Sequence, residues 1–164
     1  IISENCPEWC IAYLAFIANG FIAVPLDPHM NDVDSLKLID NSGAKLIFTS
    51  EGRKFPTKKC IDLDTVPFPS QETEPSHLIQ YEDIASIVYT SGTTSNPKGV
   101  MLTHKNFISN VVSGNKVFKC SENDSLLLLL PLYHVFSFTA IFLLGTSVGA
   151  KLIIVNTEEI LLVT

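Results

Sequence analysis

The chain has 164 residues, of which 46% are hydrophobic and 17% charged, and its formal net charge is −6 at pH 7. This length fits one domain or a large part of one, and the apolar content excludes an intrinsically disordered chain. The acidic balance argues against nucleic-acid binding, which requires clustered basic residues. We interpret the local basic cluster as a solvated loop; it contains Arg53, Lys54, Lys58 and Lys59.

The cysteines are Cys6, Cys10, Cys60 and Cys120. They form no CxxC pair, and no histidine stands at ligand spacing beside them, so neither a zinc site nor a disulfide framework is indicated. We expect buried free thiols in a reducing compartment. No basic stretch of the kind that begins a secretory signal precedes the first apolar run. These observations predict a cytoplasmic protein.

Helices and strands are predicted to alternate along the first half of the chain. A helix over 7–19 has proline in its first turn and Gly20 as its stop, and a short apolar strand follows at 21–25. A second helix, over 31–41, is predicted to bury Val33, Leu36 and Ile39 on one face, with Leu38 as a further candidate. Further on, short strands are predicted at 44–50 and, within a loop-rich region, at 59–63.

The second half continues the alternation. The predicted elements are a strand at 84–90, a polar loop at 91–99, a helix over 104–118, a strand at 125–131, a helix over 135–147 and a strand at 150–156. Strands alternating with helices of this length favour an α/β fold with a mainly parallel sheet and flanking helices.

Two uncharged runs, at 9–26 and 125–150, are long enough to raise the alternative of a membrane span. Pro131 and His134 interrupt the later run, and Gly20 lies within the earlier one. Basic residues do not gather on one flank of either run. We interpret each run as a buried helix next to a buried strand. A small membrane protein stays open as the alternative.

The segment YTSGTTSNPKGVMLTH, at 89–104, is rich in hydrogen-bond donors and poor in side-chain bulk. A glycine-rich turn between a strand and a helix binds phosphates through its N–H groups and the helix N-terminus. Lys98 adds a mobile cation, while Gly92 and Gly99 permit a close approach of the backbone or a positive φ. Because Lys98 precedes Gly99, the segment is not a Walker A loop. From composition alone, an ordinary polar turn is equally possible.

This segment resembles the signature loop of the adenylate-forming superfamily, whose pattern is close to Tyr-Thr-Ser-Gly-Thr-Thr-Gly-x-Pro-Lys-Gly. The match fails at one place, where Ser95 replaces glycine. NCPEWCIAYLAFIANGFIAVPLDP and LLLLPLYHVFSFTA resemble two further segments of the superfamily, in the expected order. PLYHVFSFT looks most like synthetases acting on fatty acids. The resemblance implies that residues 1–164 are part of the large N-terminal, AMP-binding domain, with the mobile C-terminal domain absent.

The resemblance further implies an acyl-CoA synthetase. A carboxylate attacks the α-phosphate of ATP, and coenzyme A then takes the acyl group from the acyl-adenylate. The signature loop would stabilise the departing pyrophosphate together with Mg²⁺. The residues implied to bind it are Ser91, Gly92, Thr93, Thr94, Ser95, Lys98 and Gly99.

In similar proteins the histidine at the position of His134 orients the reacting groups. A core histidine bonded to the backbone is the alternative. Phe136 and Phe138 could line an acyl pocket, but we interpret both as core residues, and Trp9 as packing. His104 is predicted to cap or shape the start of its helix.

Members of this superfamily are several hundred residues long, so we expect the chain alone to be inactive. A piece of an amino-acid-activating adenylation domain and a non-catalytic, truncated nucleotide-binding module remain alternatives. Small-molecule substrates are the expected partners. Nucleic acid is not expected, and peripheral membrane contact is possible for the intact protein.

Overall fold

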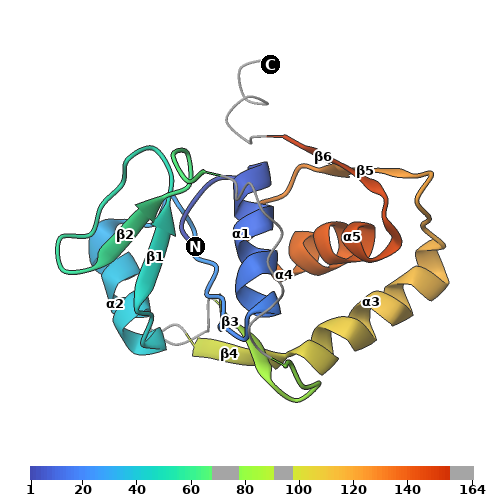
Figure 1. Cartoon of the computed structure of the whole chain (residues 1–164), viewed down its shortest axis with the longest axis horizontal. Helices are drawn as coiled ribbons and strands as arrows, with labels where there is room; N and C mark the ends of the chain where they lie inside the picture. The colour runs from blue at the N-terminus through green and yellow to red at the C-terminus, as the bar shows by residue number, and fades with distance from the viewer. Residues whose placement is uncertain (68–77, 91–97, 156–164) are drawn as a thin grey trace.

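The computed structural model describes residues 1–67, 78–90 and 98–155 (Figure 1). The elements of the first part are α1 (Pro7–Ala18), α2 (Asp32–Ser42), β1 (Leu46–Thr49), β2 (Lys59–Asp62), β3 (Ile84–Thr90) and β4 (Lys98–Thr103). The later elements are α3 (His104–Phe118), β5 (Ser125–Leu128), α4 (Val135–Ser137), the π-helical segment η1 (Phe138–Leu143), α5 (Leu144–Val148) and β6 (Lys151–Ile154). The predicted alternation is confirmed, and β4 is an addition to it.

Within the described ranges, the strands form three two-stranded sheets. β1 pairs with β2 and β5 with β6, both in parallel, whereas β3 and β4 are antiparallel. Isolated parallel bridges connect Ile2 with Leu26 and with Thr49, and Ala23 with Ser86. The strand predicted at 21–25 is therefore reduced to a single bridge at Ala23. The α/β class with mainly parallel pairing is confirmed.

The predicted helix ends are set by caps. Asn31 caps α2 by accepting a hydrogen bond from the Asp34 amide, and Gly43 ends the helix with a φ of 69°. The predicted burial of Val33 is wrong, since 65% of it is exposed. The inward face of α2 is formed by Ser35, Leu38 and Ile39, which repeat at helical spacing. Val33 stands two residues before Ser35, about 200° away around the helix, and so faces solvent.

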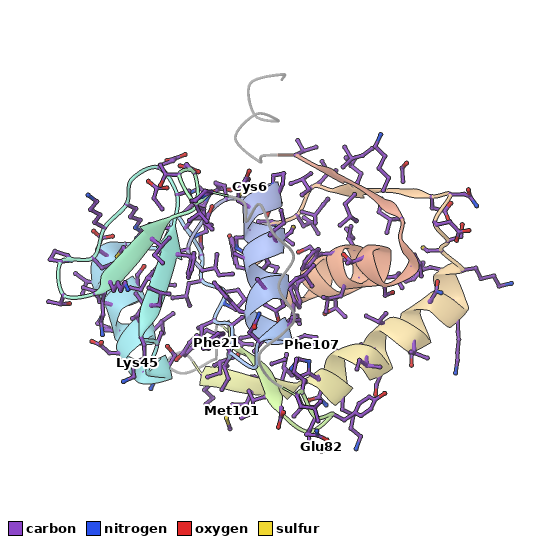
Figure 2. All side chains as sticks on the ribbon, viewed as in Figure 1. Cys6, Phe21, Lys45, Glu82, Met101 and Phe107 are labelled. Carbon is purple, nitrogen blue, oxygen red and sulfur yellow. The ribbon has the colours of Figure 1, made fainter. Side chains whose placement is uncertain are left out.

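Helix α1 lies at the centre of the molecule, between the α2–β1–β2 part and the α3–α5 part (Figure 1). Trp9 and Tyr13 on α1 are fully buried and stack with their ring centroids 5.4 Å apart. The Phe138 ring lies 4.6 Å from the Tyr13 ring and 5.4 Å from the Phe107 ring of α3, between centroids. Figure 2 labels Phe107 near the start of α3. Trp9 is thus a packing residue, as predicted. Since α1 is apolar nearly all round, it is covered on both sides.

The C-terminal uncharged run folds as a strand followed by the α4–η1–α5 helical segment. Gly145 brings α5 against β5 and β6, because a Cβ added there would lie 2.6 Å from Leu152 Cδ2 and 2.9 Å from Leu126 Cδ1. No helix in the described part of the chain has both the length and the apolar character needed to cross a membrane.

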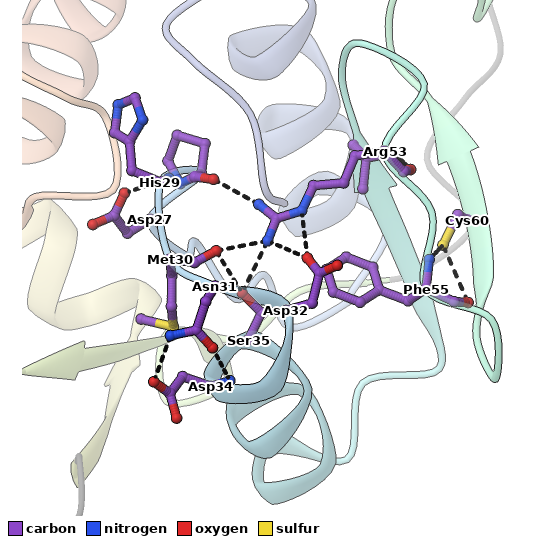
Figure 3. Close-up of polar contacts among 12 residues, drawn as sticks. Asp27, His29, Met30, Asn31, Asp32, Asp34, Ser35, Arg53, Phe55 and Cys60 are labelled. Atoms are coloured by element: carbon purple, nitrogen blue, oxygen red, sulfur yellow. Dashed lines mark hydrogen bonds and ion pairs between the residues drawn. The ribbon is translucent and has the colours of Figure 1, made fainter.

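Arg53 does not belong to a solvated loop, and that interpretation is wrong for this residue. Its guanidinium donates to the carbonyl oxygens of Pro28 at 2.6 Å and Met30 at 2.7 Å, and pairs with Asp32 Oδ1 at 2.8 Å (Figure 3). It also lies over the Phe55 ring, 5.1 Å from the centroid. Arg53 therefore fixes the turn before α2, since its fork-shaped group can satisfy several acceptors at once.

Candidate active site

The predicted phosphate-binding segment stands between two paired strands. In the β3–β4 ladder, Tyr89 is opposite Gly99 and Thr90 is opposite Lys98. Five of the seven predicted phosphate-binding residues lie outside the described residues, and their role stays a prediction. They are Ser91, Gly92, Thr93, Thr94 and Ser95.

Lys98 and Gly99 were predicted to lie in the loop, and the structure places them in β4 instead. The residues after Gly99, Val100 to Leu102, are apolar and pair with β3 before any helix start signal occurs. Gly99 has no positive φ. A Cβ at Gly99 would lie 2.9 Å from Ile87 Cγ2, so the strand approaches β3 closely at this point. The positive φ, one of the two options predicted for Gly99, is therefore not adopted, and its role in phosphate binding stays a prediction.

The predicted helix over 104–118 is confirmed as α3, but the strand β4 that separates it from the predicted loop was not expected. β4 contributes six residues, roughly 20 Å of extended chain, before α3 begins. A helix dipole acts mainly within its first turn, so the N-terminus of α3 cannot assist the predicted loop by following it. Thr103 caps α3 by a reciprocal capping box with Asn106, and His104 is the first helical residue rather than the cap.

Tyr89 anchors the end of β3 to another part of the fold. Its hydroxyl donates to Asn41 Oδ1 at 2.6 Å and lies 3.2 Å from the Leu38 carbonyl oxygen. Both partners belong to α2. The entrance to the predicted phosphate-binding segment is therefore held against a helix that precedes it by about fifty residues.

His134 lies in the connection between β5 and α4, and its side chain is exposed. Its backbone N–H donates to the Pro131 carbonyl oxygen at 3.1 Å. The Ser137 hydroxyl donates to the carbonyl oxygens of both Pro131 and His134. This short turn, which we call the His134 loop (residues 130–137), presents the imidazole to solvent. The alternative of a core histidine is excluded, because the residue is exposed and its side chain can reach a ligand.

The two phenylalanines near His134 have different environments. Phe138 is 3% exposed and packs with Trp9 and Tyr13, so its prediction as core is confirmed. Phe136 is 64% exposed, so its prediction as core is wrong. α4 begins at Val135, and its first turn points Phe136 outward while Ser137 and Phe138 face inward. Phe136 therefore adds an apolar surface two residues from the imidazole.

Acidic groups lie beside the His134 loop, and sequence reasoning missed them because they come from distant, turn-rich stretches. The Tyr133 ring lies 4.6 Å from the His134 ring. Burial raises the pKa of Tyr133 to about 12, with further contributions from the Asp27 and Glu4 carboxylates. His29 Nε2 pairs with Glu4 Oε1 at 2.9 Å. An anionic ligand at this place would need positive counter-charge, such as a divalent cation.

The predicted site residues that the structure describes come from two elements. Lys98 and Gly99 belong to the β3–β4 hairpin, and His134 belongs to the β5–α4 connection. In Figure 1 the hairpin lies below the lower end of α1, and α4 lies beside α1. Among the described residues, no group of three or more His, Cys, Asp or Glu could hold a metal ion. Mg²⁺ ordinarily reaches such sites with the phosphates of its nucleotide, so a dedicated cage is not required.

The sequence matches the model of a family described as AMP-binding enzyme over residues 1–162. The chain is 30% identical to 4-coumarate–CoA ligase CCL1 of Humulus lupulus, over 98% of this chain and 34% of that protein. It is 32% identical to 4-coumarate–CoA ligase 1 of Solanum tuberosum, over 98% of this chain and 33% of that protein. The chain therefore spans about a third of the length of these curated relatives.

Solved structures resemble the fold closely. The o-succinylbenzoate CoA synthetase (MenE) of Bacillus subtilis, in complex with the acyl-adenylate intermediate OSB-AMP, superposes with a TM-score of 0.81 at 27% identity, over 92% of this chain and 40% of that chain. The same enzyme in complex with ATP and magnesium ion gives a TM-score of 0.81 at 25% identity, over 98% of this chain and 45% of that chain.

Proposed function

Because this chain belongs to the AMP-binding enzyme family, we propose that the full-length protein carrying it is an ATP-dependent acid–CoA ligase. A carboxylate oxygen attacks the α-phosphorus of ATP, and the bond to the β-phosphate oxygen breaks to release pyrophosphate. The thiol of coenzyme A then attacks the acyl carbonyl carbon and releases AMP. The observation that carries the proposal is similarity to CoA ligases along nearly the whole chain.

The described residues suit this chemistry in two ways. The β3–β4 ladder holds Thr90 and Lys98 opposite each other, so both ends of the signature segment are fixed. Lys98 is exposed, and we propose that it neutralises phosphate charge. Further proposed phosphate-binding residues are Ser91, Gly92, Thr93, Thr94, Ser95 and Gly99. When bound, Mg²⁺ would neutralise phosphate oxygens and so assist pyrophosphate departure.

His134 is proposed to orient the reacting carboxylate and α-phosphate by hydrogen bonding. Its exposure and its rigid loop support this role. We propose an apolar carboxylic acid as substrate, because Phe136 offers an exposed aromatic surface next to the imidazole. A fatty acid is the acid first suggested by PLYHVFSFT, whereas the relatives are named for 4-coumarate and o-succinylbenzoate. Aliphatic and aryl acids should therefore be compared directly.

We propose a cytoplasmic location for the full-length protein, with peripheral membrane contact if its acid is a long-chain one. A dedicated amino-acid-activating role is the second candidate within the same family. Acid-dependent exchange of labelled pyrophosphate into ATP, followed by detection of acyl-CoA, distinguishes these cases. Exchange with an apolar acid and transfer to coenzyme A supports the proposal. Exchange with amino acids alone, or no exchange with any acid, contradicts it.

A charge-removing variant tests the phosphate role of Lys98 in the same assay. Lys98→Met should raise KM for ATP and lower exchange by about tenfold or more, since one hydrogen bond to a charged group contributes about 1.5–3 kcal/mol. Lys116→Met, in the last turn of α3, removes the same charge away from the site and is the matched control. Equal effects of the two substitutions would contradict a role of Lys98 in phosphate binding.

A further inference from the structure

The side chain of Asn5 links the start of α1 to the His134 loop. Asn5 is 6% exposed. Its Nδ2 donates to the Leu130 carbonyl oxygen at 3.0 Å, and the Leu132 N–H donates to its Oδ1 at 2.8 Å. One side-chain amide thus satisfies an acceptor and a donor on the two sides of Pro131.

This arrangement matches a need of the loop backbone. β5 ends at Leu128, and Pro131 supplies no N–H for a continued ladder. A carbonyl or N–H left buried without a partner costs about 1–3 kcal/mol. An asparagine amide offers one donating and one accepting end in a fixed geometry, so it fits this gap in the ladder in a way that an aliphatic side chain cannot.

The backbone of Pro131 connects the residues that Asn5 binds with His134. The Pro131 carbonyl oxygen, located between the two partners of Asn5, accepts from the His134 N–H at 3.1 Å and from the Ser137 hydroxyl. Leu132, 1% exposed, fixes the same turn in the core. A shift of residues 130–132 would therefore displace the backbone that carries the imidazole.

Helix α1 also holds the far end of the loop. Trp9 and Tyr13 follow Asn5 on α1, and both rings contact Phe138, at 6.1 and 4.6 Å between centroids. The start of the His134 loop is therefore held by hydrogen bonds from Asn5, and its end by ring contacts with Phe138. Both sets of contacts come from α1 and the residues just before it. Only the solvent-facing part of the loop, with His134 and Phe136, is left to meet a ligand.

We propose that Asn5 is a positioning residue for His134 in acyl-adenylate formation, an inference that rests on the proposed function. Asn5 is buried and acts through the backbone of the loop, without touching the reacting groups. Misplacement of a catalytic group by about 1 Å can cost about 100-fold in rate. Loss of Asn5 should therefore lower the turnover of adenylate formation while leaving the affinity for ATP nearly unchanged.

A double-mutant cycle in the full-length protein tests this coupling. Asn5→Ala is expected to reduce kcat for acid-dependent pyrophosphate exchange by about 10- to 100-fold, with KM for ATP changed by less than about threefold. In the His134→Ala background, Asn5→Ala should add less than about twofold, because its effect passes through the imidazole. Thr49→Val is the matched control: it also removes a buried side-chain hydrogen bond, to the Arg53 carbonyl oxygen at 2.8 Å, away from the loop.

Asn5→Asp provides a second variant with a pH readout. An ionised aspartate accepts from the Leu132 N–H but cannot donate to the Leu130 carbonyl oxygen, whereas a protonated aspartic acid can do both. Activity of Asn5→Asp relative to wild type should therefore recover as the pH falls through the pKa of the introduced carboxyl group, and Thr49→Val should show no such recovery. This variant replaces Asn5→Ala in the cycle if the alanine protein does not fold.

Amide hydrogen exchange reports on the loop independently of activity. Asn5→Ala should accelerate exchange at Leu132 and His134, while the Ile87 amide, bonded to the Ala23 carbonyl oxygen, keeps its wild-type rate. The inference is overturned if the kcat loss is the same with and without His134, or if the loop amides exchange as in wild type. A wild-type protein inactive with every acid refutes the proposed function instead, so the two failures are distinguishable.

Discussion

The Tyr89 hydroxyl donates a hydrogen bond of 2.6 Å to Asn41 Oδ1, and this contact ties the end of β3 to α2. Tyr89 is the last residue but one of β3 and the first residue of the signature segment. Burial raises the pKa of its hydroxyl, so the neutral, donating form persists across the physiological range. The fold therefore holds one side of the proposed phosphate site through a contact with a distant helix.

Removing that hydroxyl should weaken the fold slightly. We expect Tyr89→Phe to reduce the free energy of unfolding by about 1 kcal/mol, because the ring packing is kept and one hydrogen bond is lost. Chemical denaturation of the wild type and the variant measures this difference. Tyr81→Phe, at a residue that is 65% exposed, is the control and should change stability by less than about 0.5 kcal/mol. Equal losses in both variants would contradict the anchoring role.

Two glycines in helices should respond oppositely to alanine. Gly145→Ala should destabilise the fold by about 1–3 kcal/mol, because the added Cβ meets Leu152 and Leu126 at less than 3.0 Å. At Gly114, inside α3, nothing lies within 4 Å of an added Cβ. Gly114→Ala should therefore stabilise the protein by about 0.5–1 kcal/mol. Thermal unfolding of the pair checks both signs, and a stabilising Gly145→Ala would refute the packing of α5 on β5 and β6.

The thiol of Cys10 should be almost inert in the native state. All four cysteines are free, and Cys10 is 7% exposed. Burial, with the nearby Cys6 thiol as a smaller cause, raises the pKa of Cys10 to about 12. At pH 8 we expect iodoacetamide to modify Cys10 more than about 100-fold more slowly than the same residue in the denatured chain. Mass spectrometry of peptides after timed labelling measures the ratio, and comparable rates in the two states would contradict the buried placement.

His104 should make stability depend on pH. Burial lowers the pKa of its imidazole, and the Asp83 carboxylate partly opposes this shift. The unfolded state then binds the proton at a higher pH than the folded state does, so stability falls as the pH drops through about 6.5. Lowering the pH from 8 to 5 should reduce the free energy of unfolding more in the wild type than in His104→Gln. Parallel pH profiles of the two proteins, measured by urea denaturation, would contradict this assignment.

Ser95 replaces the glycine of the superfamily pattern, and it lies outside the described residues. If the position requires a positive φ, serine is strained there by about 1 kcal/mol, and Ser95→Gly should tighten ATP binding by about fivefold. Isothermal titration calorimetry on the full-length protein measures the change. Equal or weaker affinity would show that the serine hydroxyl, or a relaxed loop, compensates for the missing glycine.

The 164-residue chain is expected to produce no acyl-adenylate by itself, since the relatives it matches are about three times as long. This expectation is checked by incubating the isolated chain with ATP, Mg²⁺ and the best acid found for the full-length protein. Pyrophosphate exchange above background would contradict it.

Local signals predicted much of the fold correctly. Asn31 and Gly43 delimit α2, and apolar runs marked β1, β3, β5 and β6, because caps and burial act over a few residues. β4 was missed because its apolar residues stand between a glycine and a helix start. They could equally belong to the preceding loop or to the following helix. Within the described residues, the polar contacts of Asn5 at the His134 loop and of Arg53 at the turn before α2 escaped prediction for another reason. Arg53 and Asn5 bind backbone groups far away in sequence, and no local pattern encodes such partners.

The contact between Asn5 and Leu130 has a consequence for biosynthesis, since its partners are 125 residues apart. At roughly 5–20 residues per second, Asn5 is synthesised roughly 6–25 s before the segment it binds. The β1–β2 and β3–β4 sheets pair strands that are close in sequence and can form during that interval, whereas the β5–β6 sheet needs residues made after Leu130. We therefore expect the imidazole-bearing turn to acquire its working shape after these two sheets, once Leu130 has been synthesised and can close onto Asn5.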